Sequence, residues 1–91
     1  MATLRLSWRG NAGDARGWYA STLADKVTGR YARWQRDAAA ATSAYERWAA
    51  APTGELGWRY ATYLGMLDRE ESSARSYAAA VARLERWLRR P

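Results

Sequence analysis

The residues of this chain that are best suited to chemistry are its arginines. Fourteen of its fifteen basic residues are Arg and one is Lys, against nine acidic residues, which gives a formal net charge of +6. Arg binds phosphate through paired hydrogen bonds and stacks on bases. Arginines interleaved with Trp and Tyr along one surface are typical of sequence-tolerant nucleic-acid binding. RNA or DNA is therefore one candidate partner, although the Arg bias is equally typical of a GC-rich genome.

The candidate nucleic-acid contacts share heptad positions on two helical segments, with the aromatic side chain of Trp58 nearby. They are Lys26, Arg33 and Arg47 in the first segment and Arg69, Arg83 and Arg90 in the second. The alternative is an ordinary solvated surface, because acidic residues such as Asp25, Asp37 and Glu46 lie among these bases. Several of them are spaced for ion pairs within one helix.

Catalysis is not expected, because the 91 residues include no His and no Cys. Their absence removes the most common general base, the most common metal ligand and any thiolate site or disulfide. We therefore predict no catalytic residue, no metal site and no cofactor, and the chain is not expected to be an enzyme.

The first helical segment is marked by apolar residues that alternate at spacings of three and four, the pattern of a coiled-coil seam. The members of this seam are Ala24, Val27, Tyr31, Trp34, Ala38, Ala41, Tyr45 and Trp48. The motif Tyr31-Ala-Arg-Trp34 returns two heptads later as Tyr45-Glu-Arg-Trp48. The pattern predicts a helix over about residues 14–50, with Asp14 as its N-cap.

The second helical segment follows a break at residues 51–54. Pro52 ends the first helix, and Thr53 is placed to cap the next one. The second seam is Leu56, Tyr60, Tyr63, Leu67, Glu70, Ala74, Tyr77, Val81, Leu84 and Leu88, within a helix predicted over about residues 54–89. A connection of about four residues makes the two helices antiparallel neighbours. The predicted fold is all-α, a long antiparallel helical hairpin.

Folding the chain about this turn places small residues opposite large ones, as interdigitated packing requires. The facing pairs are Ala41 with Tyr63, Ala38 with Leu67, Tyr31 with Ala74, and Val27 with Tyr77. Glu70 falls opposite Trp34. We expect its carboxylate to be satisfied by the Trp34 indole or by Arg30 or Arg33. The alternative is that Glu70 lies at a subunit contact and sets its register, as single polar seam residues do.

The N-terminal residues 1–13 form a separate piece. Leu4, Leu6 and Trp8 alternate with polar residues, which predicts a short β-strand, and the segment 10–13 has loop chemistry. A lone strand needs a partner for its backbone groups, so we predict an intermolecular contact here, or an extended arm along the hairpin. Trp8-Arg-Gly10 is similar to the Trp-x-Gly motif of WXG100-type hairpin proteins. That family carries the motif between its helices, so membership is not predicted.

The apolar stripe of both helices is wider than one partner helix covers. The predicted protein interface combines the N-terminal segment with residues beside the seams: Leu4, Leu6, Trp8, Trp18, Leu23, Leu64, Met66 and Trp87. The hairpin is therefore expected to be completed by itself, as a dimer or tetramer, or by docking onto a larger protein assembly.

Three functions fit these observations. The first is a non-catalytic interaction or structural subunit of a homo- or hetero-assembly. The second is a basic nucleic-acid-binding accessory subunit that contacts the phosphate backbone, by fold-level analogy with small helical subunits of bacterial ribonucleoprotein defence complexes. The third is a protein-binding regulator such as an inhibitor or antitoxin.

The location is predicted to be cytoplasmic. No N-terminal stretch has the pattern of a signal peptide, and no run approaches the roughly 18–20 apolar residues of a membrane span. The segment from Leu84 to Arg90 is amphipathic, which fits either contact with an anionic membrane surface or basic residues placed at the end of a helix dipole.

Overall fold

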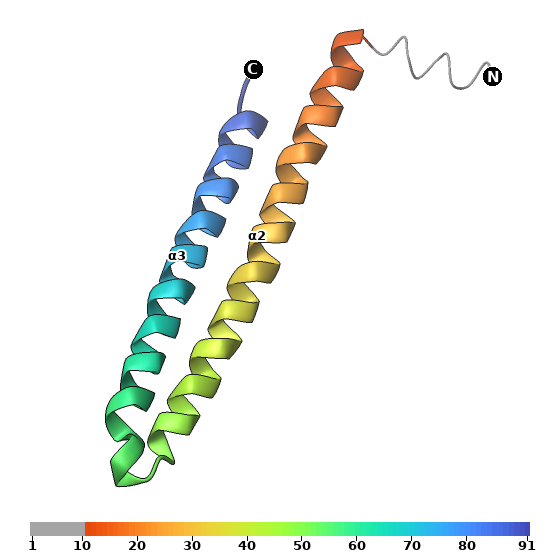
Figure 1. Cartoon of the computed structure of the whole chain (residues 1–91). Coiled ribbons are helices and arrows are strands. Elements are labelled where there is room, and N and C mark those ends of the chain that lie inside the picture. Colours follow the sequence, from red (N-terminus) through yellow and green to blue (C-terminus); the bar gives the residue numbers. More distant parts are fainter. Residues whose placement is uncertain (1–10) are drawn as a thin grey trace, which may run out of the picture.

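The computed structural model describes residues 11–91, which form an all-α helical hairpin. Its elements are α2 (Asn11–Ala49), the short 3₁₀ helix η1 (Thr53–Glu55) and α3 (Leu56–Leu88). The two long helices run side by side in opposite directions, and the C-terminus lies at the same end as the start of α2 (Figure 1). With 39 and 33 residues, they are about 58 and about 50 Å long at 1.5 Å per residue. The strand or arm predicted around Leu4, Leu6 and Trp8 lies outside the described residues.

Helix α2 begins at Asn11, earlier than the pattern predicted. Asp14 is therefore within the first turn and is not the N-cap, and residues 11–13 are helical where a loop was expected. An N-cap residue lies outside the helix that it caps, so a residue that follows three helical residues does not serve as one.

The turn between the helices is held by backbone hydrogen bonds. Pro52 is extended, with φ −63° and ψ 156°, and precedes η1. The Glu55 N–H donates to the Pro52 carbonyl at 2.8 Å, and the Ala51 N–H donates to the Trp48 carbonyl at 3.1 Å. The prediction that Thr53 caps the second helix is wrong, because Thr53 is itself the first residue of η1, and Glu55 is the residue before α3.

The helices meet along a double row of buried or half-buried residues on each helix. On α2 these contact rows are Leu23, Val27, Arg30, Trp34, Asp37, Ala41, Ala44 and Trp48. On α3 they are Arg59, Tyr63, Met66, Glu70, Ser73, Tyr77, Ala80, Leu84 and Trp87. Each predicted seam consists of two rows of residues. One row lies in the contact, as predicted. The other row lies beside the contact, and the residues one position earlier in the sequence take its place.

The displaced row is explained by side-chain size. Packed helices lie about 8–10 Å apart. Of the five residues that are buried in the described part of the chain, only Leu23, at 3% exposure, has a large side chain. The others are Ala41, Ala44, Ser73 and Ala80. These small residues allow close approach, whereas the predicted seam residues Tyr31 and Tyr45 remain 46% and 48% exposed beside the contact. Half of the predicted seam therefore forms one flank of the hairpin.

Candidate functional site

Two aromatic clusters join the helices, and the first is built on Tyr77 of α3. The Trp34 ring stacks on Tyr77 with centroids 5.4 Å apart and planes 21° apart. Tyr31 meets the same ring at 5.4 Å, whereas the predicted register placed Ala74 opposite Tyr31. Such pairs add about 0.5–1.5 kcal/mol each beyond the burial of their area.

The second cluster repeats the first one two heptads away, on Tyr63 of α3. Trp48 stacks on Tyr63 at 5.8 Å and 11°, and Tyr45 meets it at 5.5 Å. The groove beside this cluster brings Ala41 next to Tyr63, as the predicted pairing had it. In both clusters, the Tyr-x-x-Trp motif of α2 therefore holds one tyrosine of α3 between a stacked indole ring and a tilted phenol ring.

The buried centre of the contact is polar. The Trp34 indole N–H donates to Glu70 Oε2 at 2.6 Å, which confirms the predicted pairing. The Arg30 guanidinium reaches across to the Ser76 carbonyl at 3.4 Å, and Asp37 Oδ2 is buried without a hydrogen-bond partner. The Ser73 hydroxyl donates to the Arg69 and Glu70 carbonyls of its own helix.

Replacing Trp34 by phenylalanine is expected to destabilise the hairpin by about 1–3 kcal/mol more than the matched change Trp48→Phe. Both changes remove an indole from an equivalent cluster, but only the first leaves a half-buried carboxylate without its donor. Denaturant unfolding followed by circular dichroism measures both free energies of unfolding. Equal losses in the two variants would show that the Trp34–Glu70 hydrogen bond contributes nothing.

One flank of the hairpin is apolar, and we call it the tyrosine face. It consists of Ala24, Tyr31, Ala38 and Tyr45 on α2 and Tyr60, Leu67, Ala74 and Val81 on α3. Tyr60 is 43% exposed, like the two tyrosines of α2. An open groove of about 320 Å³ lies on this face, lined by Ala41, Thr42, Tyr45, Tyr63 and Leu67. The next row outward on α3 contributes Leu64, which is 41% exposed, and two carboxylates, Glu71 and Glu85.

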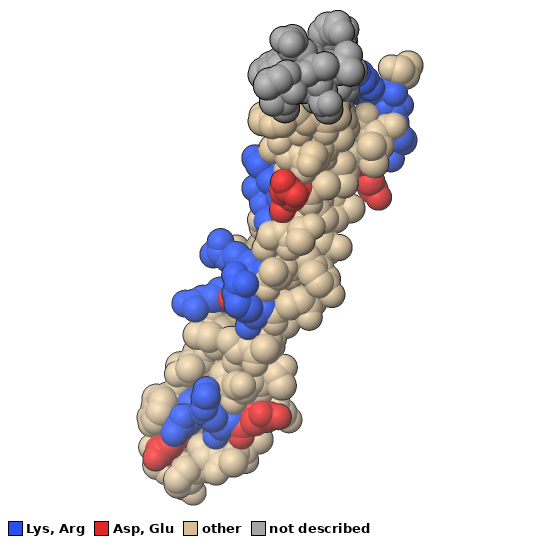
Figure 2. Space-filling view, turned by 90° about the vertical axis from the view of Figure 1, so that its right-hand side faces the viewer, with Lys and Arg blue, Asp and Glu red and all other residues tan. Residues whose placement is uncertain are grey.

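The opposite flank is basic, and we call it the basic face. It carries Lys26, Arg33 and Arg47 on α2 and Arg69, Arg83 and Arg90 on α3. Figure 2 shows Lys and Arg side chains gathered along the left-hand side of the molecule at mid-height, while the right-hand side at that height lacks them. The charges of this chain are therefore distributed unequally between its two flanks.

Three hollows lie along the basic face. The first, of about 160 Å³, is lined by Arg30, Arg33, Arg69, Ser72, Ser73 and Ser76. The second, of about 40 Å³, is lined by Leu23, Lys26, Arg30, Ala79, Ala80 and Arg83. The third, of about 200 Å³, is lined by Tyr19, Leu23, Arg83, Arg86, Trp87 and Arg90. The structure thus brings together Arg33 with Arg69, Lys26 with Arg83, and Arg83 with Arg90.

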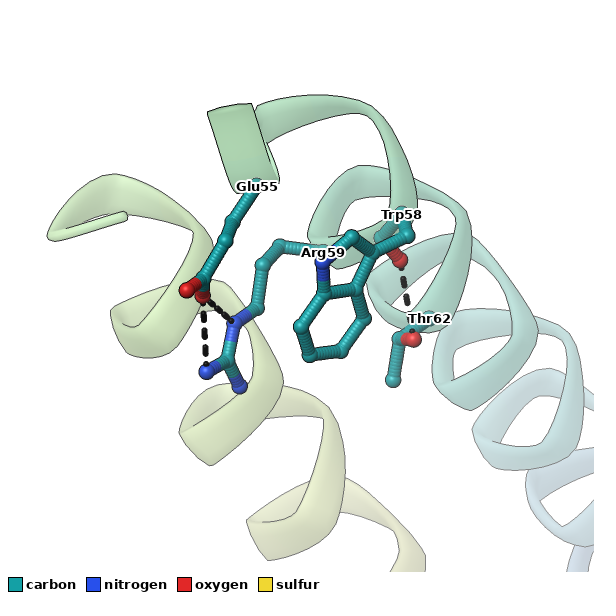
Figure 3. A network of polar contacts seen from close by, with 4 residues as sticks. All are labelled: Glu55, Trp58, Arg59 and Thr62. Atoms are coloured by element: carbon teal, nitrogen blue, oxygen red, sulfur yellow. Dashed lines mark hydrogen bonds and ion pairs between the residues drawn. The ribbon is translucent and has the colours of Figure 1, made fainter. Parts of the chain in front are cut away.

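Two predicted nucleic-acid contacts lie apart from these hollows. Arg47 is exposed near the turn and lines none of them. Trp58 is 54% exposed, but the Arg59 guanidinium lies over its ring at 4.2 Å while bonding Glu55, as Figure 3 shows. The Thr62 hydroxyl donates to the Trp58 carbonyl at 2.9 Å. Only one face of the Trp58 ring is therefore open for stacking.

The predicted protein-interface residues have different environments. Trp18 is 69% exposed and Leu64 is 41% exposed, so both are available to a partner. Leu23 is buried between the helices, and Met66 is half-buried in the contact row of α3. The prediction is corrected for Leu23, because Leu23 stabilises the hairpin itself.

Trp87 occupies the open end of the hairpin. It is half-buried and packs edge-on against Tyr19 at 4.8 Å. The guanidinium groups of Arg16 and Arg90 lie over its ring, at 4.9 and 5.2 Å from the centroid. Trp87 is thus more a part of the basic face than of an apolar interface.

Comparison of the chain with models of protein families, with curated proteins and with solved structures gives no match. Within the described helices, none is long and apolar enough to cross a membrane. No group of three or more acidic residues gathers to hold a metal ion in the part of the chain that the structure describes. The two faces are consequently the features from which a function can be argued.

Proposed function

We propose that this chain is a non-catalytic interaction subunit whose tyrosine face packs against the tyrosine face of a second copy. The observation that carries the proposal is the row of half-exposed rings, Tyr31, Tyr45 and Tyr60, on one flank of the hairpin. Contiguous apolar surface of this kind marks interaction sites in soluble proteins. Tyr is also enriched in the cores of protein interfaces.

The thin core of the single hairpin supports this proposal. No side chain in the described range is less than 2% exposed, and most of the buried residues are small. A domain of this length already has little apolar burial to offset the entropy of folding. Pairing two hairpins through their tyrosine faces produces a four-helix bundle, in which these rings become core residues.

The charge distribution favours a second copy as the occupant. The eight residues that make up the tyrosine face carry no charge, so no like charges oppose each other at the centre of a contact between two copies. Their basic faces point away from each other, which separates two subunits that each carry a net charge of +6. An interface between identical patches related by a two-fold axis is also the most common kind among homo-oligomers.

Size-exclusion chromatography with light scattering tests the proposal. The wild-type chain is expected to have twice the mass of one chain, and Tyr45→Glu and Thr42→Arg are expected to have the monomer mass. Thr42 is exposed and lines the groove, so the second change leaves the packing within one hairpin intact. Ala39→Glu, on the exposed back of α2, is the matched control and should remain dimeric.

A monomeric wild-type chain would contradict the proposal. So would variants of the tyrosine face that keep the mass of the wild type, because the assembly would then use another surface. Circular dichroism of each variant separates loss of pairing from loss of the helices themselves.

A further inference from the structure

We propose that the basic face binds the backbone of a single-stranded nucleic acid along its three hollows. The hollows adjoin, because Arg30 lines both the first and the second, and Arg83 lines both the second and the third. Together they are lined by seven basic residues, Lys26, Arg30, Arg33, Arg69, Arg83, Arg86 and Arg90. Among the side chains that the structure describes, no carboxylate lines any of the three.

The first hollow has the chemistry of a phosphate site. Three guanidinium groups converge on it from both helices, from Arg30, Arg33 and Arg69, beside the Ser72 hydroxyl. Guanidinium groups form paired, charge-assisted hydrogen bonds with phosphate oxygens. Arg30 is held in place by its bond to the Ser76 carbonyl, so less side-chain freedom is lost when an anion binds.

The third hollow adds aromatic surface at the open end. It is lined by Tyr19 and Trp87 together with three arginines, and Tyr19 is 40% exposed. Bases stack on such rings with little regard to sequence, because every base has a π face. The same strand can therefore place its phosphates on the arginines and a base against the Tyr19 ring.

The dimensions favour a single strand over a duplex. From Arg69 to Arg90 the basic face extends about 30 Å at 1.5 Å per residue, which suits a site of several nucleotides. The contacts come from two helices side by side, each about 10–12 Å wide. The pair is too broad to enter the major groove of a duplex, which is about 12 Å across.

Fluorescence anisotropy with a labelled oligothymidylate tests this proposal. We expect the double variant Arg33→Gln, Arg69→Gln to bind about 25-fold more weakly at ~0.1 M salt, because each phosphate contact on a single strand contributes about 0.7 to the log–log salt slope. The slope should fall by about 1.4 for the two contacts.

The matched control is Arg75→Gln, Arg89→Gln, which removes the same charge from an exposed position on α3 and from the exposed residue that follows α3, neither of which lines a hollow. It is expected to bind like the wild type. The proposal is overturned if both double variants lose the same affinity, if duplex DNA binds as tightly as the single strand, or if polyglutamate competes equally well. Because the basic and tyrosine faces are opposite flanks, a monomeric protein in solution would not affect this test.

Discussion

Ala44→Glu is expected to remove a large part of the stability of this protein and to lower its unfolding midpoint, as measured by denaturant unfolding followed by circular dichroism. Ala44 is 3% exposed in the contact row of α2, where a new carboxylate would be removed from water. An unpaired buried charge costs about 3–5 kcal/mol. Small domains have a total stability of about 0.05–0.15 kcal/mol per residue, so this cost is a large part of the stability of a 91-residue chain.

The control for this prediction is Ala39→Glu, which introduces the same side chain on the exposed back of the same helix. It should keep the helical spectrum and the wild-type unfolding midpoint, because its carboxylate remains in water. If Ala44→Glu were as stable as Ala39→Glu, Ala44 would not lie between the helices, and the contact rows would have to be reassigned.

The second large effect is a dependence of the melting temperature on protein concentration. Unfolding that is coupled to dissociation of a dimer shifts by mass action, and a hundred-fold rise in concentration is worth about 2.7 kcal/mol per dimer. With an unfolding entropy of about 2.1 cal/mol/K per residue over two chains of 91 residues, the midpoint should rise by about 7 °C. Differential scanning calorimetry at several concentrations measures this shift.

The variant Thr42→Arg should remove the concentration dependence without unfolding the hairpin, because Thr42 lines the groove but is exposed. A wild-type melting temperature that is constant over the same range would mean that association adds no stability to the folded hairpin. The thin core would then be sufficient for stability by itself.

The sequence was sufficient to predict the hairpin and part of its register. The alternation of three and four residues located both helices, and the pairing of Trp34 with Glu70 follows from the position of the turn. The choice between adjacent rows could not be made. Tyr31 and Asp37 both lie at coiled-coil spacing from Trp34, and hydrophobicity favours Tyr31, yet Asp37 is in the contact row. Small residues elsewhere in that row determine how closely the backbones approach.

The basic face was predicted more accurately than the seam beside it. Four of its residues come directly before a residue of a confirmed row: Lys26, Arg33, Arg69 and Arg83. Their side of the hairpin is therefore the same in the predicted and the observed packing. Arg30 was expected as an alternative partner of Glu70, and its place in the hollows of the basic face is apparent only when the contact rows are known. The one sequence feature that indicates this place is that Arg30 lies four residues before Trp34, and therefore on the same side of the helix.

The duplicated aromatic cluster has a consequence for how uniquely the helices can align. Tyr63 and Tyr77 are as far apart on α3 as Trp48 and Trp34 are on α2, and each indole stacks on one of these tyrosines. If α3 slid by two heptads, Tyr77 would reach Trp48, and Glu70 would meet that indole instead of Trp34. A slide in the opposite direction would bring Tyr63 to Trp34. The same two helices on separate chains would therefore have three alignments that stack an indole on a tyrosine, one with both clusters and two with a single cluster. Within one chain the slid alignments are excluded, because the turn at Pro52 is too short to allow them.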